Sequence, residues 1–259
     1  MTALLSLPPV PARYRGVWRR TLLKTAAMED VSTVVFWLQT ARWHADIRIP
    51  ARRGDFSGVS SLAECDRAQL ESLACQQGFA GITQIDANGQ DDICRWHRLI
   101  DYQPPASLPD VGAMRFSAGL LIEQGVCADY LEHWVHQATS EQGALVLRRE
   151  EGSALRLLLV AGPYVMHARA RRKAFPSDLP LDTDLSSFDD EQLRALLDFE
   201  IAFGLRTDTG WTVQHATLPW LEGKQIAVNL RRDGERAVLD WDGASSVWQI
   251  EEWFAPDAI

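Results

Sequence analysis

Short strand-like runs joined by tight turns make up most of this chain of 259 residues, and they constrain its fold more than any other feature. The segment 43–49 is typical, because Trp43 and Ile47 fall on one face of an extended chain and Asp46 and Arg48 on the other. Strands are expected at residues 14–23, 33–40, 43–49, 79–85, 93–102, 114–123, 130–137, 144–149, 155–160, 164–171, 199–206, 211–220, 225–231, 237–241 and 247–253. Short connections predict antiparallel pairing, and a long meander removes its exposed edges by closing into a barrel.

Two short helices are expected within this β-rich pattern. Leu62, Leu70 and Leu73, with Ala63 and Ala74, predict a short amphipathic helix that ends near Gly78. A second helix is expected over residues 191–197, where the carboxylate of Asp189 suits the N-cap position. Each helix interrupts a run of strands at a similar point, which is the first sign of a repeat.

The order of elements occurs twice, and this indicates an internal duplication. The residue matches between the two halves are Tyr14 and Trp18 with Tyr130 and Trp134, His44 with His167, Gln69 with Gln192, Gly81 with Gly204, and His97 with His215. The alternative is chance similarity between two β-rich stretches with one helix each. The predicted fold class is therefore all-β with two short helices, arranged as two tandem antiparallel barrels over residues 1–126 and 127–259.

Charge and composition exclude several classes of partner. The chain has 26 basic and 35 acidic residues and a formal charge of −9, which argues against nucleic acid. No run approaches the roughly 18 apolar residues of a membrane helix, so no membrane association is expected. The start of the chain lacks the pattern of a signal peptide, and the four cysteines form no C-x-x-C pair, so we expect reduced thiols in a cytoplasmic protein.

One short motif resembles a known family. Gly16-Val17-Trp18, near the start of the first strand, resembles the G-x-W signature of lipocalins and the wider calycin superfamily. The segments 14–20 and 96–104 are similar to those of a little-studied family of two-barrel, lipocalin-like proteins from bacteria and fungi. The resemblance implies barrels in which Trp18 closes one end, and it supplies no catalytic residues.

The main functional prediction is a non-enzymatic binding protein whose barrel holds a small apolar or amphipathic ligand. The candidate ligand-binding residues are Trp18, Phe36, Trp43, His44, Arg48, Trp96 and His97. Strand alternation favours an inward-facing Trp43 and Ile47 and an outward, solvated face for His44, Asp46 and Arg48. Whether either barrel is hollow or filled stays open at this point.

Two alternatives remain. If the polar face pointed inward, His44, Asp46, Arg48 and His97 would supply acid–base groups for an isomerase, cyclase or decarboxylase. The chain would otherwise be a scaffold that binds a protein partner through its outer surface. We predict no catalytic nucleophile, no cofactor and no metal site, because the sequence lacks nucleophile and nucleotide-binding motifs.

Overall fold

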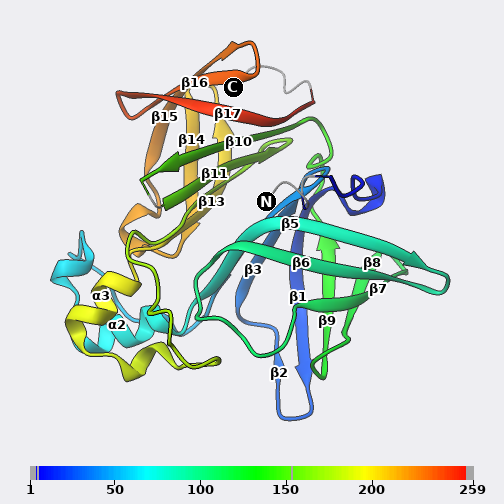
Figure 1. Ribbon diagram of the computed structural model, residues 1–259, viewed down its shortest axis with the longest axis horizontal. Helices are drawn as coiled ribbons and strands as arrows, with labels where there is room; N and C mark the ends of the chain where they lie inside the picture. The colour runs from blue at the N-terminus through cyan, green and yellow to red at the C-terminus, as the bar shows by residue number, and fades with distance from the viewer. Residues whose placement is uncertain (1–3, 5, 153, 255–259) are drawn as a thin grey trace.

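The computed structural model describes residues 4, 6–152 and 154–254, and these residues form two eight-stranded antiparallel β-barrels in tandem (Figure 1). The predicted all-β fold class is confirmed. The first barrel contains β1 (Gly16–Thr25), β3 (Val34–Gln39), β4 (Trp43–Ile49), β5 (Gln77–Asn88), β6 (Asp91–Asp101), β7 (Val111–Ser117), β8 (Leu120–Gly125) and β9 (Tyr130–His136). These strands pair in chain order, and β9 pairs with β1 to close the barrel. A two-residue strand, β2 (Glu29–Asp30), pairs with the end of β1.

The second barrel repeats this arrangement. Its strands are β10 (Ala144–Glu151), β11 (Ala154–Ala161), β12 (Tyr164–Arg169), β13 (Glu200–Thr207), β14 (Gly210–Ala216), β15 (Gln225–Asp233), β16 (Arg236–Trp241) and β17 (Ala244–Phe254), and β17 closes it against β10. The helices α2 (Arg67–Ala74) and α3 (Asp190–Leu196) each connect the third and fourth strands of a barrel. Within the described residues, no helix is both long and apolar enough to cross a membrane.

The two helices begin with the same local structure. The carboxylate of Asp66 accepts a hydrogen bond from the backbone N–H of Gln69, and Asp189 does the same for Gln192. In each case the glutamine side chain returns to the N-cap backbone, which completes a capping box. The predicted N-cap at Asp189 is confirmed. The helices lie side by side at one edge of the molecule, where Arg67 and Asp190 form an ion pair (Figure 1).

The expected division after residue 126 is wrong by one strand. β9 pairs with β1 and β8, so residues 130–136 complete the first barrel. The error arises because the run 114–123 is two strands joined by a turn at Ala118 and Gly119, which both have positive φ. Asn-Gly at this point would have predicted a hairpin turn, but Ala-Gly does not. Trp134 therefore lies in the same barrel as Trp18 and is not its counterpart.

Strand register corrects the histidine matches between the halves. Gly81 and Gly204 mark the same bulge in each barrel, where a Cβ would collide with a backbone carbonyl oxygen of the next strand. Two residues before each glycine, Phe79 pairs with Asp46 and Ala202 pairs with His167. The counterpart of His167 is thus Asp46 rather than His44.

The same bulge shows that His97 and His215 do not correspond. Gly81 pairs with Arg98 and Gly204 pairs with Val213, so Trp96 and Trp211 occupy equivalent positions two residues earlier. The duplicated feature of this strand is the inward tryptophan. The duplication itself is supported by the repeated strand order, helices and bulges.

The largest apolar cluster lies between the barrels rather than inside either of them. It joins the outer faces of β3, β4 and β5 to those of β11, β12 and β13, and the ring of Phe36 stacks on Phe203 at a centroid distance of 4.2 Å. Buried members include Val17, Trp43, Ile47, Leu157, Met166 and Ile201. Burying a side chain of this size stabilises a fold by about 1.5–3 kcal/mol, so this layer holds the barrels together.

This packing reverses the predicted orientation of the first barrel's strands. Trp43 and Ile47 point outward into the layer between the barrels, whereas Asp46 and Arg48 point into the barrel. Alternation predicts that the apolar face of a strand is buried, but it does not say where. Here that face is buried against the second barrel, and the polar face is buried inside the first barrel.

Candidate functional site

Charged side chains fill much of the interior of the first barrel. Asp46, Glu123 and Glu132 are 1%, 3% and 2% exposed, and Arg20 is 7% exposed. They come from β4, β8, β9 and β1 and all point inward. Because burying a charge is costly unless it is paired, this cluster needs a specific explanation.

Each arginine of the cluster lies between two carboxylates. Arg48 Nε donates to Asp46 Oδ1 at 2.7 Å, and its Nη1 lies 3.5 Å from Glu132 Oε1. Arg20 Nη1 donates to the same Glu132 oxygen at 2.6 Å, and its Nη2 donates to Asp30 Oδ2 at 3.0 Å. These guanidinium groups are therefore already supplied with negative charge.

Arg98 repeats this pattern at the end of the barrel. Its two terminal nitrogens lie 3.0 Å from Asp101 and 2.6 Å from Asp110, and its guanidinium carbon lies 3.8 Å from the centroid of the Phe79 ring. Three arginines of the cluster thus face five carboxylates, which belong to Asp30, Asp46, Asp101, Asp110 and Glu132.

Glu123 adds a sixth carboxylate that makes no ion pair among the described residues. Its Oε1 accepts a hydrogen bond from the Tyr130 hydroxyl at 2.7 Å, and its Oε2 accepts one from Trp134 Nε1 at 3.0 Å. Burial raises the pKa of Glu123 well above its ordinary value, and the carboxylates of Glu132 and Asp110 raise it further. The group is held by neutral donors and lacks a cation.

Glu132 also has one carboxylate oxygen that accepts no hydrogen bond from the described residues. This oxygen, Oε2, is buried. Glu132 lies directly across the β8–β9 pair from Glu123, so the two inward carboxylates are neighbours. The cluster is therefore short of hydrogen-bond donors and positive charge.

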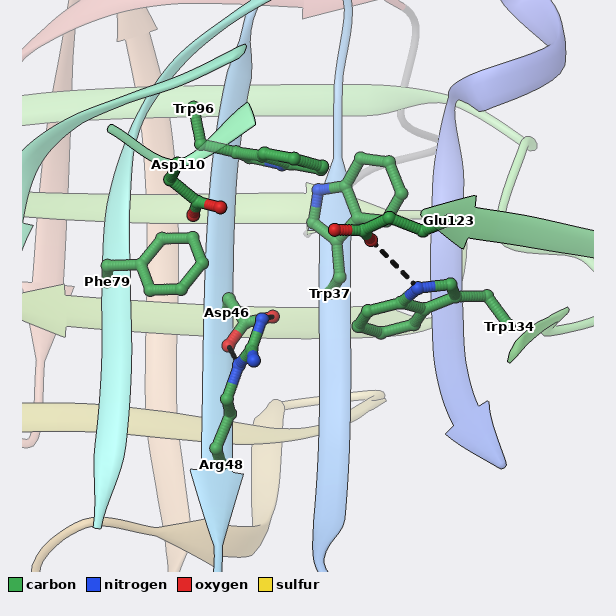
Figure 2. Close-up of a pocket in the computed structure, with 8 residues that line it drawn as sticks. All are labelled: Trp37, Asp46, Arg48, Phe79, Trp96, Asp110, Glu123 and Trp134. Atoms are coloured by element: carbon green, nitrogen blue, oxygen red, sulfur yellow. Dashed lines mark hydrogen bonds and ion pairs between the residues drawn. The ribbon is translucent and has the colours of Figure 1, made fainter. Parts of the chain in front are cut away.

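Three tryptophans form the wall beside these carboxylates. The Trp37 ring meets Trp96 and Trp134 edge to face, each at a centroid distance of 5.8 Å. Figure 2 shows the carboxylate of Glu123 between the rings of Trp37 and Trp134, and that of Asp110 between the rings of Trp96 and Phe79. A water molecule's centre can reach about 10 Å³ of this space, which is room for one water.

This space lies beneath an open depression of about 330 Å³ at the end of the barrel, which we call the mouth. Arg48 and Asp110 line both, and Glu132, Arg98 and Tyr130 line the mouth alone. A depression of this size suits a small ligand or one side chain of a larger one.

The second barrel is filled as well, but mostly with apolar side chains. Its internal cavity also has room for about one water, roughly 10 Å³, and its lining includes Leu158, Val160, Val165 and Trp211. The cavity found inside each barrel is thus far smaller than a lipid-like molecule.

Four of the predicted site residues point into the first barrel. Arg48 and Trp96 belong to the charged cluster and its aromatic wall. Trp18 lies near the opposite end from the mouth, where its Nε1 donates to the carbonyl of Tyr14 at 2.8 Å.

His44, the fourth, is fully buried within the barrel wall. The hydroxyl of Thr83 donates to Gln39 Oε1, so His44 donates from Nδ1 to Thr83 Oγ1 at 3.0 Å. Its Nε2 has no partner among the described residues, and burial lowers the pKa of the imidazole well below its ordinary value.

Three other predicted residues lie outside the barrel. Phe36 and Trp43 pack in the layer between the barrels. His97 pairs with Ile82 on the outer face, whereas the next residue pair, Thr83 with Trp96, faces inward. His44 and His97 are therefore separated by the barrel wall, and the catalytic histidine pair of the enzyme alternative is not assembled.

Sequence reasoning missed the residues that supply most of the site, namely Trp37, Asp110, Glu123, Glu132 and Trp134. A signal for two of them was present. Glu123 and Glu132 flank a short turn at equal distances, so a hairpin there would have placed both carboxylates on one face. The wrong division after residue 126 separated them.

The equivalent positions of the second barrel carry different chemistry. Counting along the paired strands from the shared bulge, Leu239 replaces Glu123 and Ser246 replaces Glu132. Leu158 replaces Trp37, because it pairs with His167 as Trp37 pairs with Asp46. The barrel fold therefore forms without these carboxylates.

Comparisons with known proteins support the fold and assign no activity. No protein-family model matches the chain, and no curated protein does. A crystal structure of an uncharacterized Saccharomyces cerevisiae protein, YLR301w, superposes with a TM-score of 0.60 and 12% sequence identity, over 93% of this chain and 99% of that one. At this identity the likeness shows the fold alone.

Proposed function

We propose that the chain is a non-catalytic binding protein that holds a small cationic group, a protonated amine, at the mouth of the first barrel. One observation carries the proposal. The first barrel buries Glu123 and Glu132 at positions where the second barrel has Leu239 and Ser246. Since the fold does not require these carboxylates and their burial is costly, we infer that they serve a ligand.

The carboxylate cluster is short of hydrogen-bond donors and positive charge, and this indicates a ligand that carries a positive charge. An ammonium group has three donors and a positive charge. It would satisfy the free Oε2 of Glu132 and balance Glu123, whereas an anion would meet arginines that already have two carboxylates each. The π-faces of the tryptophan wall line the space directly beneath the mouth, and they also favour a cation.

The interior argues against the apolar ligand expected from the sequence. The space inside each barrel is close to that of one water, and the first barrel is lined by charge. Trp18 is 3% exposed and lies near the end of the barrel opposite the open mouth, and this supports the proposal that a ligand enters at the mouth.

Calorimetric titration with n-butylammonium tests the proposal, with butanoate as the probe of equal length and opposite charge. We expect n-butylammonium to bind with a Kd of about 1 mM or tighter and butanoate not to bind. Glu132→Gln should weaken the affinity at least about tenfold, while Ser246→Ala, at the equivalent position, should not change it. Thermal unfolding of each variant verifies that it is folded. Equal binding of the two probes, or none of n-butylammonium, would overturn the proposal.

A further inference from the structure

Four exposed apolar side chains lie on connections at the same end of the first barrel as the mouth. Met28 and Val31 belong to the connection between β1 and β3, Leu108 to that between β6 and β7, and Val126 to that between β8 and β9. They are 52%, 71%, 53% and 53% exposed. These connections lie at the same end of the barrel, and Figure 1 shows the β1–β2 hairpin and the β8–β9 turn projecting there. We call these four side chains the apolar rim.

The surroundings of the rim are acidic. Asp129 is exposed in the β8–β9 turn and lines the mouth, and Glu29 is exposed on the β1–β2 hairpin. The two basic residues that line the mouth are already paired with carboxylates, Arg98 with Asp101 and Asp110, and Arg48 with Asp46 and Glu132. With a formal charge of −9 for the whole chain, this end attracts a basic partner.

The hairpin that carries half of the rim is tied to the carboxylate cluster. Asp30 Oδ1 accepts hydrogen bonds from the backbone N–H groups of Ser32 at 2.9 Å and Thr33 at 3.1 Å. The other oxygen of Asp30 pairs with Arg20, which also holds Glu132. The rim is thus positioned by the residues that form the charged site, and an occupant would contact both.

We propose that the occupant of the mouth is a lysine side chain of a partner protein, with the apolar rim packed against the partner residues around it. This inference rests on the proposed function and names the source of the cation. A free small amine would leave the rim in water, whereas a folded or extended partner would cover it. Lysine fits better than arginine because its ammonium is a compact charge on a long apolar stem.

Peptide binding separates this inference from the proposed function. The probes are a pooled set of capped pentapeptides with a central lysine, the same set with a central acetyl-lysine, and n-butylammonium alone. We expect the lysine pool to contain peptides that bind at least about tenfold tighter than n-butylammonium, and the acetylated pool to lose this binding.

Rim variants supply the second readout. The double variant Val31→Ser with Val126→Ser should lower the affinity for the selected peptides several-fold. It should leave the affinity for n-butylammonium unchanged. Val247→Ser changes a side chain of the second barrel that is 54% exposed and serves as the matched control. Surface changes of this kind alter stability by about 0.5 kcal/mol or less, so the variants should fold.

The outcomes are distinct. If n-butylammonium binds but no peptide binds more tightly, or the rim variants change nothing, the partner inference is wrong and the proposed function stands. Equal binding of the acetylated peptides would also overturn the inference. If neither n-butylammonium nor any lysine peptide binds, both proposals are wrong.

Discussion

The two barrels share strand order, helix position and a glycine bulge, yet they fill equivalent inward positions with different chemistry. Glu123 of the first barrel corresponds to Leu239 of the second, and Trp37 corresponds to Leu158. The second barrel shows what the fold alone needs, which is a filled and mostly apolar interior. The difference between the two therefore isolates the features of the first barrel that the fold does not explain.

The second barrel also has inward polar groups, and its carboxylates are matched by cations, while the unpartnered buried atoms among its described residues are the donors Arg156 Nε and Trp211 Nε1. His167 Nδ1 lies 2.8 Å from Glu200 Oε1, and Arg169 pairs with Asp198 at 2.7 Å. In the first barrel the equivalent residues, Asp46 and Arg48, continue into a network with excess carboxylates. The comparison teaches that unbalanced charge, rather than buried charge as such, marks the candidate site.

The largest change in stability is expected when Leu239 of the second barrel is replaced by glutamate, the residue at the equivalent position of the first barrel. Leu239→Glu would place a carboxylate among apolar side chains without the hydroxyl that Tyr130 provides in the first barrel. The indole N–H of Trp248, at the position equivalent to Trp134, already donates to Ser246. We expect a loss of about 3–5 kcal/mol in the free energy of unfolding, measured by urea denaturation. A loss below about 1 kcal/mol would show that the barrels tolerate charge equally, and the comparison would fail.

Removing Glu132 should have the next largest effect. Glu132→Leu takes one carboxylate from both Arg20 and Arg48, and Arg20 is almost fully buried. We expect a loss of about 3 kcal/mol in the free energy of unfolding. Ser246→Ala at the equivalent position should cost about 1 kcal/mol, because it removes the hydrogen bond from Trp248 Nε1. Similar losses in the two variants would contradict the account.

A smaller effect is expected in the pH dependence of the free energy of unfolding, and the raised pKa of Glu123 fixes its direction. Because burial raises the pKa of Glu123 above its unfolded value, the folded state binds its proton more tightly than the unfolded state. This group therefore lowers stability as pH rises from the unfolded pKa toward the raised folded pKa. Glu123→Gln removes that loss, and its amide can still contact Tyr130 and Trp134.

The expected result for Glu123→Gln is a gain in the free energy of unfolding at pH 8 relative to the wild type and no gain at pH 4. The gain amounts to about 1.4 kcal/mol for each unit by which the pKa is raised. Urea denaturation at both pH values measures it. A gain that is equal at the two pH values would mean that the proton on Glu123 is not involved.

Much of the fold was predictable because local patterns determined it. The strands, both helices and the Asp189 cap followed from alternation, helical spacing and a capping residue. The turn at Ala118 was not predictable, because an alanine at positive φ carries no turn signal. That missing turn displaced the division between the barrels.

The candidate site was less predictable, for a tertiary reason. Alternation separates the faces of a strand but does not say which one faces a barrel's interior when a second barrel covers the outside. The apolar face of β4, with Trp43 and Ile47, is buried between the barrels, and this left Arg48 inside. Arg48 and Trp96 were identified, whereas Glu123 and Glu132 required the correct pairing of β8 with β9.

Indole N–H signals in a two-dimensional ¹H–¹⁵N NMR spectrum test the central claim most directly, because each barrel provides its own tryptophans. During titration with n-butylammonium, we predict that the signals of Trp37, Trp96 and Trp134 shift, and that Trp134 shifts most because it donates to Glu123. The signals of Trp211 and Trp248 in the second barrel should stay in place. No shift of the first group, or equal shifts of both groups, would contradict the claim that the first barrel's mouth binds a protonated amine.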